Sequence, residues 1–360
     1  MTAALPIGPW GVVLAGAYPR GRSAFDRLVP RPLLPVVQTP IVAYPLRWLA
    51  EAGVLGATVC ANSTTRTVRN ALHGTSGLPA RVEFHEDWMP RGAAGCVRDA
   101  GLQTDARTFI VVDGTTIPCG DLRVLLDTHR RSEAALTVCA HSEPRATVSN
   151  AALRPNGVYV FDRSIFDHIA SHGFQDIKEA LIPRLHSAGV RIAVHECQGA
   201  CPRIYDARSY LTVNRWAISR LSVNGFVPQD YTRRGEALVH ASARVSPQAR
   251  LIGPLVLGYG VTVEDNATLV GPTAIGSGSL VARGAVVSRS VVWRNCRLGR
   301  DSLVDRCVLS DDVLVPPRAS LYGALKTASL RRPVRSVGGL WMKSRVWVES
   351  MLPIRASGVA

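Results

Sequence analysis

The sequence has almost no lysine. Lysine occurs only at Lys178, Lys326 and Lys343, so nearly all of the 42 basic residues are arginines, and the formal net charge is +15. An arginine bias of this kind often follows genomic base composition. We find no zinc-finger, RNP or basic-zipper motif, so no nucleic-acid partner is expected. A basic surface equally favours nucleotide phosphates, an acidic protein or an anionic membrane.

Long apolar runs are also missing, and their absence excludes some classes of protein. No run of about 18 uncharged apolar residues occurs, so no transmembrane helix is expected. The N-terminus lacks a basic segment before its apolar part, which favours a first strand over a signal peptide. Cys60 and Cys139 lie inside apolar runs, which indicates reduced core thiols in a cytoplasmic protein. His195, Cys197 and Cys201 lack a fourth metal ligand, and we interpret their proximity as coincidence.

The sequence does contain a long six-residue repeat. Aliphatic residues recur at this interval without a miss at Val239, Val245, Leu251, Leu257, Val263, Leu269, Ile275, Val281 and Val287. Six is neither a helical nor a strand period, so the repeat predicts a solenoid whose units bury apolar faces by stacking. The pattern slips by one residue after Val287 and resumes at Val292. An ordinary β-sandwich would not keep phase over nine units.

Small or β-branched residues accompany the repeat and suit its tight corners. They are Ala243, Ala249, Val261, Ala267, Thr273, Ser279 and Ala285. The pattern resembles the hexapeptide left-handed parallel β-helix, which acyltransferases share with the C-terminal domains of many sugar-nucleotide enzymes. The fold alone therefore assigns no function. Acyl transfer would need a catalytic histidine, and His240, the only histidine in the repeat, is expected to be exposed to solvent.

The first 200 residues predict an α/β domain. Strands are expected at 10–15, 57–61, 109–113, 134–140, 158–161 and 190–195, and helices at 40–53, 65–72, 121–131 and 176–185. Alternation of strands and helices predicts a mostly parallel sheet wrapped by helices. Ligands of such sheets bind beyond the carboxyl ends of the strands, where residues 16–31 and 114–116 are expected.

Five segments of this domain carry a resemblance to a known family. They are Leu14-Ala15-Gly16 with residues 30–35, residues 90–95 with Glu86 upstream, residues 156–161, residues 174–185, and Tyr210-Leu211 with Asn214. In this order they resemble the signature of sugar-1-phosphate nucleotidyltransferases, also called nucleotide-sugar pyrophosphorylases. With the repeat, the resemblance covers roughly residues 8 to 320. The most similar branch is mannose-1-phosphate guanylyltransferase, which commonly carries this C-terminal β-helix.

The resemblance implies a domain organisation and an activity. An α/β Rossmann-like nucleotidyltransferase domain is expected at 8–221, a linker at 222–236, a left-handed β-helix at 237–321 and a basic, tryptophan-containing tail at 322–360. The family joins an NTP to a sugar 1-phosphate and releases pyrophosphate, and Mg²⁺ is its cofactor.

The resemblance also implies a set of site residues. Those expected at the catalytic centre are Arg31, Arg22 and Arg20. Those expected to bind the nucleotide are Leu14, Ala15, Gly16, Glu86, Gly92, Ala94, Gly95, Asp113 and Gly157. Asp113 and Asp206 are the carboxylates nearest to the family's two metal-binding positions.

The sequence departs from the family at the residues that carry the chemistry. The first metal position is Thr115, with Asp113 two residues earlier, and the second is Arg203, with Asp206 as the nearest acid. Arg31 replaces the lysine between two prolines and differs from it in shape and hydrogen bonding. The family's glycines and its Glu-Lys pair are also replaced, by Ala17, Pro19 and residues 142–145. Two-site Mg²⁺ binding is therefore not expected.

Two hypotheses follow for the function. In the first, the chain is a non-catalytic regulatory or scaffolding paralogue that binds a nucleotide or nucleotide-sugar, as a homo-oligomer or paired with an active paralogue through the β-helix. In the second, it is an active nucleotidyltransferase, making for example GDP-mannose with Mg²⁺ on Asp113, Asp121 or Asp206. Asp113 is equally well explained as a turn former at the end of a strand.

The C-terminal tail combines aromatic and cationic residues, above all at 330–335 and 340–348. This mixture suits peripheral contact with an acidic membrane surface. Because a solenoid needs capped ends, we favour a tail that folds back over the end of the β-helix.

Overall fold

The computed structural model describes residues 8–16, 29–62, 64–89, 91–143, 152–223, 227, 230–329 and 346–350. The chain divides into two compact units. The first includes Pro30–Leu34 and Pro40–Arg203, and the second includes Pro35–Thr39 and the residues from Ile204 onward. Within the described residues, no helix is both long enough and apolar enough to cross a membrane.

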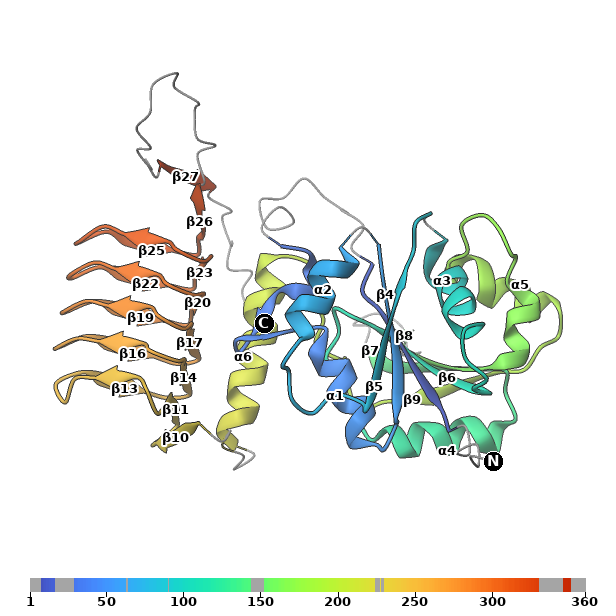
Figure 1. The fold of residues 1–360 in the computed structure, drawn as a ribbon. Helices are drawn as coiled ribbons and strands as arrows, with labels where there is room; N and C mark the ends of the chain where they lie inside the picture. The colour runs from blue at the N-terminus through green and yellow to red at the C-terminus, as the bar shows by residue number, and fades with distance from the viewer. Residues whose placement is uncertain are drawn as a thin grey trace, which may run out of the picture. The chain divides into compact units, whose positions relative to one another are not determined.

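The first unit is built on a seven-stranded sheet (Figure 1). In spatial order its strands are β5 (Arg81–Glu86), β4 (Gly56–Ala61), β1 (Trp10–Leu14), β6 (Thr108–Asp113), β8 (Ala152–Asp162), β7 (Leu136–Glu143) and β9 (Ile192–Glu196). The first four strands are parallel, and β9 is parallel to β7. Strand β8 is antiparallel to both of its neighbours. The predicted sheet is therefore confirmed as mostly parallel, but strict βαβ alternation does not extend through β8.

Helices cover both faces of this sheet. One face packs against α1 (Ala43–Glu51), α2 (Thr65–Leu72) and α4 (Leu122–Ser132), and the other against α3 (Gly92–Gly101) and α5 (Ile182–Ser187). Val13 lies in the first core and Val12 in the second, because successive side chains of a strand point to opposite faces. A 3-10 helix, η3 (Arg163–His168), and a short π-helix, η4 (Ile177–Leu181), complete the second face.

The expected strands and helices of this unit occur, and the elements that the sequence did not predict are β5, α3 and the short helices η2 (Arg31–Leu33) and η3. Strand β5 is only half-buried, so it has no apolar run. Helix α3 contains three glycines, which lower intrinsic helix propensity. The expectation of a reduced thiol at Cys139 is wrong, because Cys139 forms a disulfide with Cys197. Cys60 is a buried free thiol, as expected.

The second unit contains three parallel sheets. Successive strands of the chain belong to the first, the second and the third sheet in turn. The first holds β11 (Ala237–His240), β14 (Leu255–Leu257), β17 (Thr273–Ile275), β20 (Val291–Val292), β23 (Val308–Leu309) and β26 (Leu325–Ser329). The second holds β12 (Arg244–Val245), β15 (Thr262–Val263), β18 (Leu280–Val281), β21 (Arg297–Leu298) and β24 (Leu314–Val315). The third holds β13 (Arg250–Ile252), β16 (Thr268–Val270), β19 (Val286–Ser288), β22 (Leu303–Asp305) and β25 (Ser320–Tyr322).

Each strand of these sheets pairs with the third strand after it. Leu257 pairs with Ile275, eighteen residues on, and Ile275 pairs with Val292, seventeen residues on. The slip of one residue after Val287 is therefore present in the strand register. The repeated aliphatic residues form one core in which Leu269, Val281 and Val287 have no exposed surface. This pattern is consistent with the predicted β-helix.

Two antiparallel strands extend the first of these sheets. Strand β10 (Tyr231–Arg234) pairs with β11, and β27 (Val346–Ser350), from the C-terminal tail, pairs with β26. His240, expected to be exposed, is half-buried and contacts the rings of Tyr231 and Tyr259 at centroid distances of 5.1 and 5.3 Å.

Helix α6 (Ala207–Val223) belongs to the second compact unit. Its Ile218 packs with Leu238, Val256 and Ala274 of the first repeat sheet. Tyr210 accepts a hydrogen bond of 2.8 Å from the indole nitrogen of Trp293. Because of this packing the compact units separate after Arg203, earlier than the expected linker at 222–236.

Candidate functional site

Several predicted site residues meet at the carboxyl edge of the first sheet. Leu14 is in register with both Cys60 and Asp113, and Glu86 is in register with Ala61. The amide of Gly114 donates to the carbonyl of Leu14 at 2.9 Å, and the amide of Ala15 donates to the carbonyl of Cys60 at 2.7 Å. Gly16 follows directly and is exposed. The structure thus brings Leu14, Ala15, Gly16, Glu86 and Asp113 to the edge where ligands of such sheets bind.

Asp113, the last residue of β6, forms an ion pair with Arg203. Arg203 Nη2 donates to Oδ2 of Asp113, and both side chains are only about a quarter exposed, at 23% and 24%. The other carboxylate oxygen, Oδ1, accepts from the amide of Thr115 at 2.9 Å and from its hydroxyl at 2.6 Å. Both oxygens of Asp113 are therefore engaged. The two positions at which the resemblance implies metal-binding aspartates, Thr115 and Arg203, both contact Asp113.

Gly157 lies against this ion pair. Its φ is +79°, and a Cβ there would be 3.3 Å from the Cβ of Asp113 and 3.4 Å from Oγ1 of Thr116. Glycine tolerates this conformation at no steric cost. Two residues on, burial raises the pKa of Tyr159 to about 12, while the charge of Arg203 acts to lower it.

The segment that carries Arg203 is held by Asn156, which is 5% exposed. Its Oδ1 accepts from the amide of Cys201 at 3.2 Å and lies 2.7 Å from Nδ1 of His141. Its Nδ2 donates to the carbonyl of Gly199 at 3.3 Å. Sequence reasoning named Asn156 only within the family resemblance. An Asn-Gly pair directly before a buried strand was the available signal.

The predicted residues Gly92, Ala94 and Gly95 contact another part of the same unit. The amides of Ala94 and Gly95 donate to the carbonyl of Gln175 at 2.9 and 3.4 Å. Gly92 has a φ of +75°, and a Cβ there would be 2.5 Å from that carbonyl oxygen. Two N-terminal amides of α3 are therefore already used, and a phosphate would bind them only by displacing Gln175.

Arg91, next to these glycines, is 8% exposed and forms an ion pair with Asp99 at 2.9 Å. It also donates to the carbonyls of Ala170 and Gly173. Arg91 therefore fastens α3 to the 170–175 segment.

The remaining predicted residues are spread over different elements. Arg31 is half-buried and begins the turn η2 (Arg31–Leu33), where the carbonyl of Pro32 accepts from Val42 at 3.0 Å. Arg20 and Arg22 lie outside the described residues. Asp206, in the second unit, caps α6 through hydrogen bonds of 2.8 Å from the amide and hydroxyl of Ser209. Burial acts to raise the pKa of Asp206, but these hydrogen bonds outweigh it and lower the pKa.

The described residues do not fit a magnesium site. Mg²⁺ binds through hard oxygen ligands, usually one or two carboxylates. Both oxygens of Asp113 accept other hydrogen bonds, and the neighbouring position holds the cation Arg203. Among the residues that the structure describes, no three His, Cys, Asp or Glu side chains group as metal ligands would. His195 lies 2.9 Å from the hydroxyl of Thr128, and Cys197 is in a disulfide.

Comparison with known proteins gives a consistent set of relatives. No protein-family model matches the chain. A UTP–glucose-1-phosphate uridylyltransferase from Synechocystis is 23% identical over 337 residues, which are 82% of this chain and 86% of that protein. A mannose-1-phosphate guanylyltransferase from Mycobacterium tuberculosis is 27% identical over 312 residues, which are 77% of this chain and 82% of that protein.

One solved structure shows the same fold in the N-terminal part. A Bacillus anthracis protein assigned as a glucose-1-phosphate thymidylyltransferase superposes with a TM-score of 0.50 and 15% sequence identity. The superposition covers 58% of this chain and 95% of that one. The first unit therefore has the Rossmann-like nucleotidyltransferase fold.

Proposed function

We propose that this chain, a member of the sugar-1-phosphate nucleotidyltransferase family, binds a nucleotide or nucleotide-sugar without catalysing nucleotidyl transfer. The observation that carries the proposal is the ion pair between Arg203 and Asp113. We infer a regulatory or scaffolding role in the biosynthesis of nucleotide-sugars or polysaccharides.

The argument is electrostatic. Nucleotidyl transfer develops negative charge on phosphate oxygens, and Mg²⁺ neutralises it. A divalent ion about 4 Å from the Arg203 guanidinium would be repelled by on the order of 8 kcal/mol at an effective dielectric constant of about 20. Binding Mg²⁺ at Asp113 would also break the ion pair with Arg203. Both effects oppose a metal at this place.

Binding of a ligand without metal has support at the same edge of the sheet. Glu86 is half-buried at the end of β5, and Trp88, two residues later, is 84% exposed. An exposed indole offers a flat surface on which a base can stack. We propose that Leu14, Ala15, Gly16, Glu86 and Gly157 line the ligand site, together with Arg31.

We propose further that the repeat unit is a left-handed parallel β-helix and the surface through which the chain assembles, either with itself or with an active paralogue. The stacking of short parallel strands in three sheets, two of them with five strands each, supports this proposal (Figure 1). The domain limits we propose are 8–221 for the nucleotidyltransferase-like domain, whose last helix, α6, packs on the first repeat sheet, 222–236 for the linker, 237–321 for the β-helix and 322–360 for the tail.

Pyrophosphate release tests the proposal. Purified protein with Mg²⁺ is given GTP, dTTP or UTP with mannose 1-phosphate or glucose 1-phosphate, and binding of each nucleotide is followed by calorimetry. We expect binding of at least one nucleotide or of GDP-mannose and no pyrophosphate above the protein-free rate. Turnover would refute the non-catalytic reading.

An active enzyme is the second candidate, and one observation favours it. The chain matches 86% of the Synechocystis uridylyltransferase and 82% of the Mycobacterium tuberculosis guanylyltransferase, so most of the length of both enzymes has a counterpart in this chain. In this case Arg203 would swing away from Asp113 when Mg²⁺ and substrate bind. Loss of turnover in Asp113→Asn would then identify the metal ligand.

A further inference from the structure

The segment between β9 and Arg203 is fastened at both ends by cysteines. At its start, Cys197 forms a disulfide with Cys139 of β7, and its amide donates to Ala140 at 2.7 Å. Near its end, the sulfur of Cys201 accepts from the amide of Cys119 at 3.2 Å. Residues 197–203 therefore form a short strap, which we call the arginine strap, with Arg203 as its last residue.

The second attachment lies beside the ion pair. Cys119 follows the turn that leaves β6 after Asp113, and Cys201 stands two residues before Arg203. Between them the amide of Ile117 donates to Pro202 at 2.8 Å, and Thr116 and Arg203 form an isolated antiparallel bridge. A covalent bond between Cys119 and Cys201 would thus join the two segments that carry Asp113 and Arg203.

Cys119 and Cys201 are close together, since the amide nitrogen of Cys119 lies 3.2 Å from Sγ of Cys201. The hydrogen bond with Cys119, together with burial, raises the pKa of the Cys201 thiol. Cys201 is 7% exposed, whereas Cys119 is half-buried and can be reached from solvent. The more accessible of two paired thiols is the one that reacts first in thiol–disulfide exchange.

We propose that Cys119 and Cys201 are a reversible redox site whose disulfide locks the arginine strap against the end of β6. The co-reactant is a low-molecular-weight disulfide, RSSR. The Cys119 thiolate attacks one sulfur, forms a mixed disulfide and releases RS⁻. Cys201 then loses its proton and attacks the Cys119 sulfur, which forms the Cys119–Cys201 bond and releases the second RS⁻. The two protons lost by the protein convert both thiolates to RSH, so one RSSR is reduced to two thiols.

The chain contains a matched control. The thiols of Cys60 and Cys96 are likewise hydrogen-bonded to each other, but both are buried, at 1% and 6% exposed. The two pairs differ mainly in access, because only Cys119 is open to solvent. A reaction that depends on solvent access to one thiol of the pair will modify Cys119 and Cys201 and spare Cys60 and Cys96.

The test is disulfide mapping of the full chain. Native protein is incubated with glutathione disulfide, quenched with acid, alkylated and analysed by peptide mass spectrometry. We expect a Cys119–Cys201 cross-link that dithiothreitol removes, with Cys60 and Cys96 recovered as alkylated thiols. Recovery of Cys119 and Cys201 as free thiols under conditions that fully oxidise an unfolded control would overturn the proposal.

The consequence for Arg203 is measured separately. Hydrogen exchange of the peptide covering 198–203 should slow about tenfold when the wild-type protein is oxidised, because an added cross-link suppresses local opening. Cys119→Ser and Cys119→Ala, at a half-buried position, should show no such change. Equal exchange rates before and after cross-linking in the wild type would show that the bond does not control the strap. Neither measurement depends on whether the chain is catalytic.

Discussion

Arg203 donates to the carboxylate of Asp113 across 90 residues of sequence. The contact joins the end of β6 to the strap that follows β9, and each side chain is about a quarter exposed. The position at which the family resemblance implies the second metal-binding carboxylate thus holds a cation, and this cation pairs with Asp113, the carboxylate nearest to the first such position. This internal neutralisation is the physical basis of our proposal that the chain binds its ligand without Mg²⁺.

Removal of Arg203 should cost stability as well as charge balance. In Arg203→Ala the partly buried Asp113 loses its partner, and we expect a loss of about 1–2 kcal/mol in the free energy of unfolding. Arg130→Ala is the matched control, because Arg130 forms its ion pair with Asp127 on the surface, where both side chains are more than half exposed. That change should stay within about 0.5 kcal/mol. Urea denaturation measures both, and equal losses would contradict a structural role for the Arg203 pair.

Substitution of Gly157 should be costly for two separable reasons. Alanine at Gly157 must adopt a φ of +79° and also crowd Asp113 and Thr116. Gly189 has a φ of +67° with nothing within 4 Å, so Gly189→Ala measures the backbone cost alone. We expect about 1 kcal/mol for Gly189→Ala and about 1 kcal/mol more for Gly157→Ala. Thermal and urea denaturation compare the stabilities of the two variants. If Gly157→Ala is no less stable than Gly189→Ala, a Cβ at position 157 does not crowd its neighbours.

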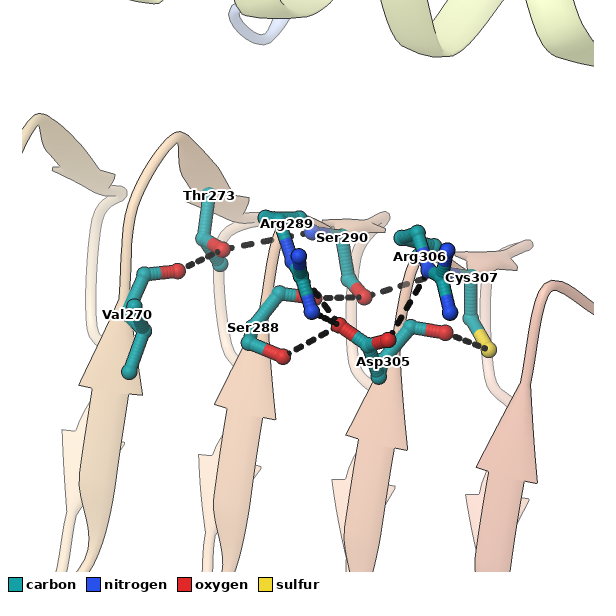
Figure 2. Close-up of polar contacts among 8 residues, drawn as sticks. All are labelled: Val270, Thr273, Ser288, Arg289, Ser290, Asp305, Arg306 and Cys307. Atoms are coloured by element: carbon teal, nitrogen blue, oxygen red, sulfur yellow. Dashed lines mark hydrogen bonds and ion pairs between the residues drawn. The ribbon is translucent and has the colours of Figure 1, made fainter. Parts of the chain in front are cut away.

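A polar ladder runs up one corner of the repeat unit (Figure 2). Ser290 accepts the amide of Cys307 at 3.0 Å and donates to the carbonyl of Ser288 at 2.6 Å, while Thr273 accepts the amide of Ser290 at 3.2 Å. Ser290 is fully buried, so Ser290→Ala leaves a buried amide without its acceptor and should cost about 1–3 kcal/mol.

Two controls accompany this prediction. Ser290→Thr should largely retain the bond, because threonine fills the same place one coil earlier at Thr273. Ser320→Ala, at an exposed position of β25, should be nearly neutral. The hydrogen-exchange rate of the Cys307 amide measures the loss of its hydrogen bond to Ser290 directly. An unchanged rate in Ser290→Ala would exclude the ladder as a source of stability.

Asp305 should make the stability of the repeat unit depend on pH. Burial acts to raise the pKa of Asp305, but hydrogen bonds from Ser288 and Arg289, with Arg306, outweigh it and lower the pKa (Figure 2). A carboxyl whose pKa is lowered by folding contributes stability above its unfolded pKa and loses it as pH falls through the folded value.

The measurement is urea denaturation of the wild type and Asp305→Asn at pH 6 and at pH 3. We expect the wild type to lose more stability than the variant over this interval, because only the wild type must protonate Asp305. Parallel losses in the two proteins would mean that Asp305 does not contribute through its charge.

Restoring carboxylates at the family positions should restore affinity for metal. In the double variant Thr115→Asp with Arg203→Asp, the cation is removed and two acids join Asp113. We expect Mg²⁺ binding by calorimetry that the wild type lacks, because hard oxygen ligands then replace the guanidinium. Thr115→Asn with Arg203→Asn keeps the size of the side chains without charge and should not bind Mg²⁺.

The sequence was most informative where one physical constraint repeats. The aliphatic residues from Val239 to Val287 must all point inward, so their spacing predicted both the stacked strands and the slip of register at Val292. The sequence also predicted the buried strands Trp10–Leu14 and Thr108–Asp113, because a strand buried on both faces is a continuous apolar run.

The site was predicted only in part. Thr115 and Arg203 could be recognised as departures from the family, but the pairing of Arg203 with Asp113 depends on how the chain returns after β9. The disulfide at Cys139 was missed for the same reason, since its partner Cys197 is 58 residues away. Helix α3 was missed because its glycines lower helix propensity. Glycine is present there because the helix lies close to Gln175 and Arg91.

The most direct test of the central claim is the metal dependence of ligand binding by the wild-type protein. GTP and GDP-mannose are titrated calorimetrically into the full chain, once with Mg²⁺ and once with EDTA. If the Arg203–Asp113 pair replaces the metal, at least one ligand binds and its Kd agrees within about twofold between the two conditions, a difference of about 0.4 kcal/mol. A Kd at least tenfold lower with Mg²⁺ would contradict the account.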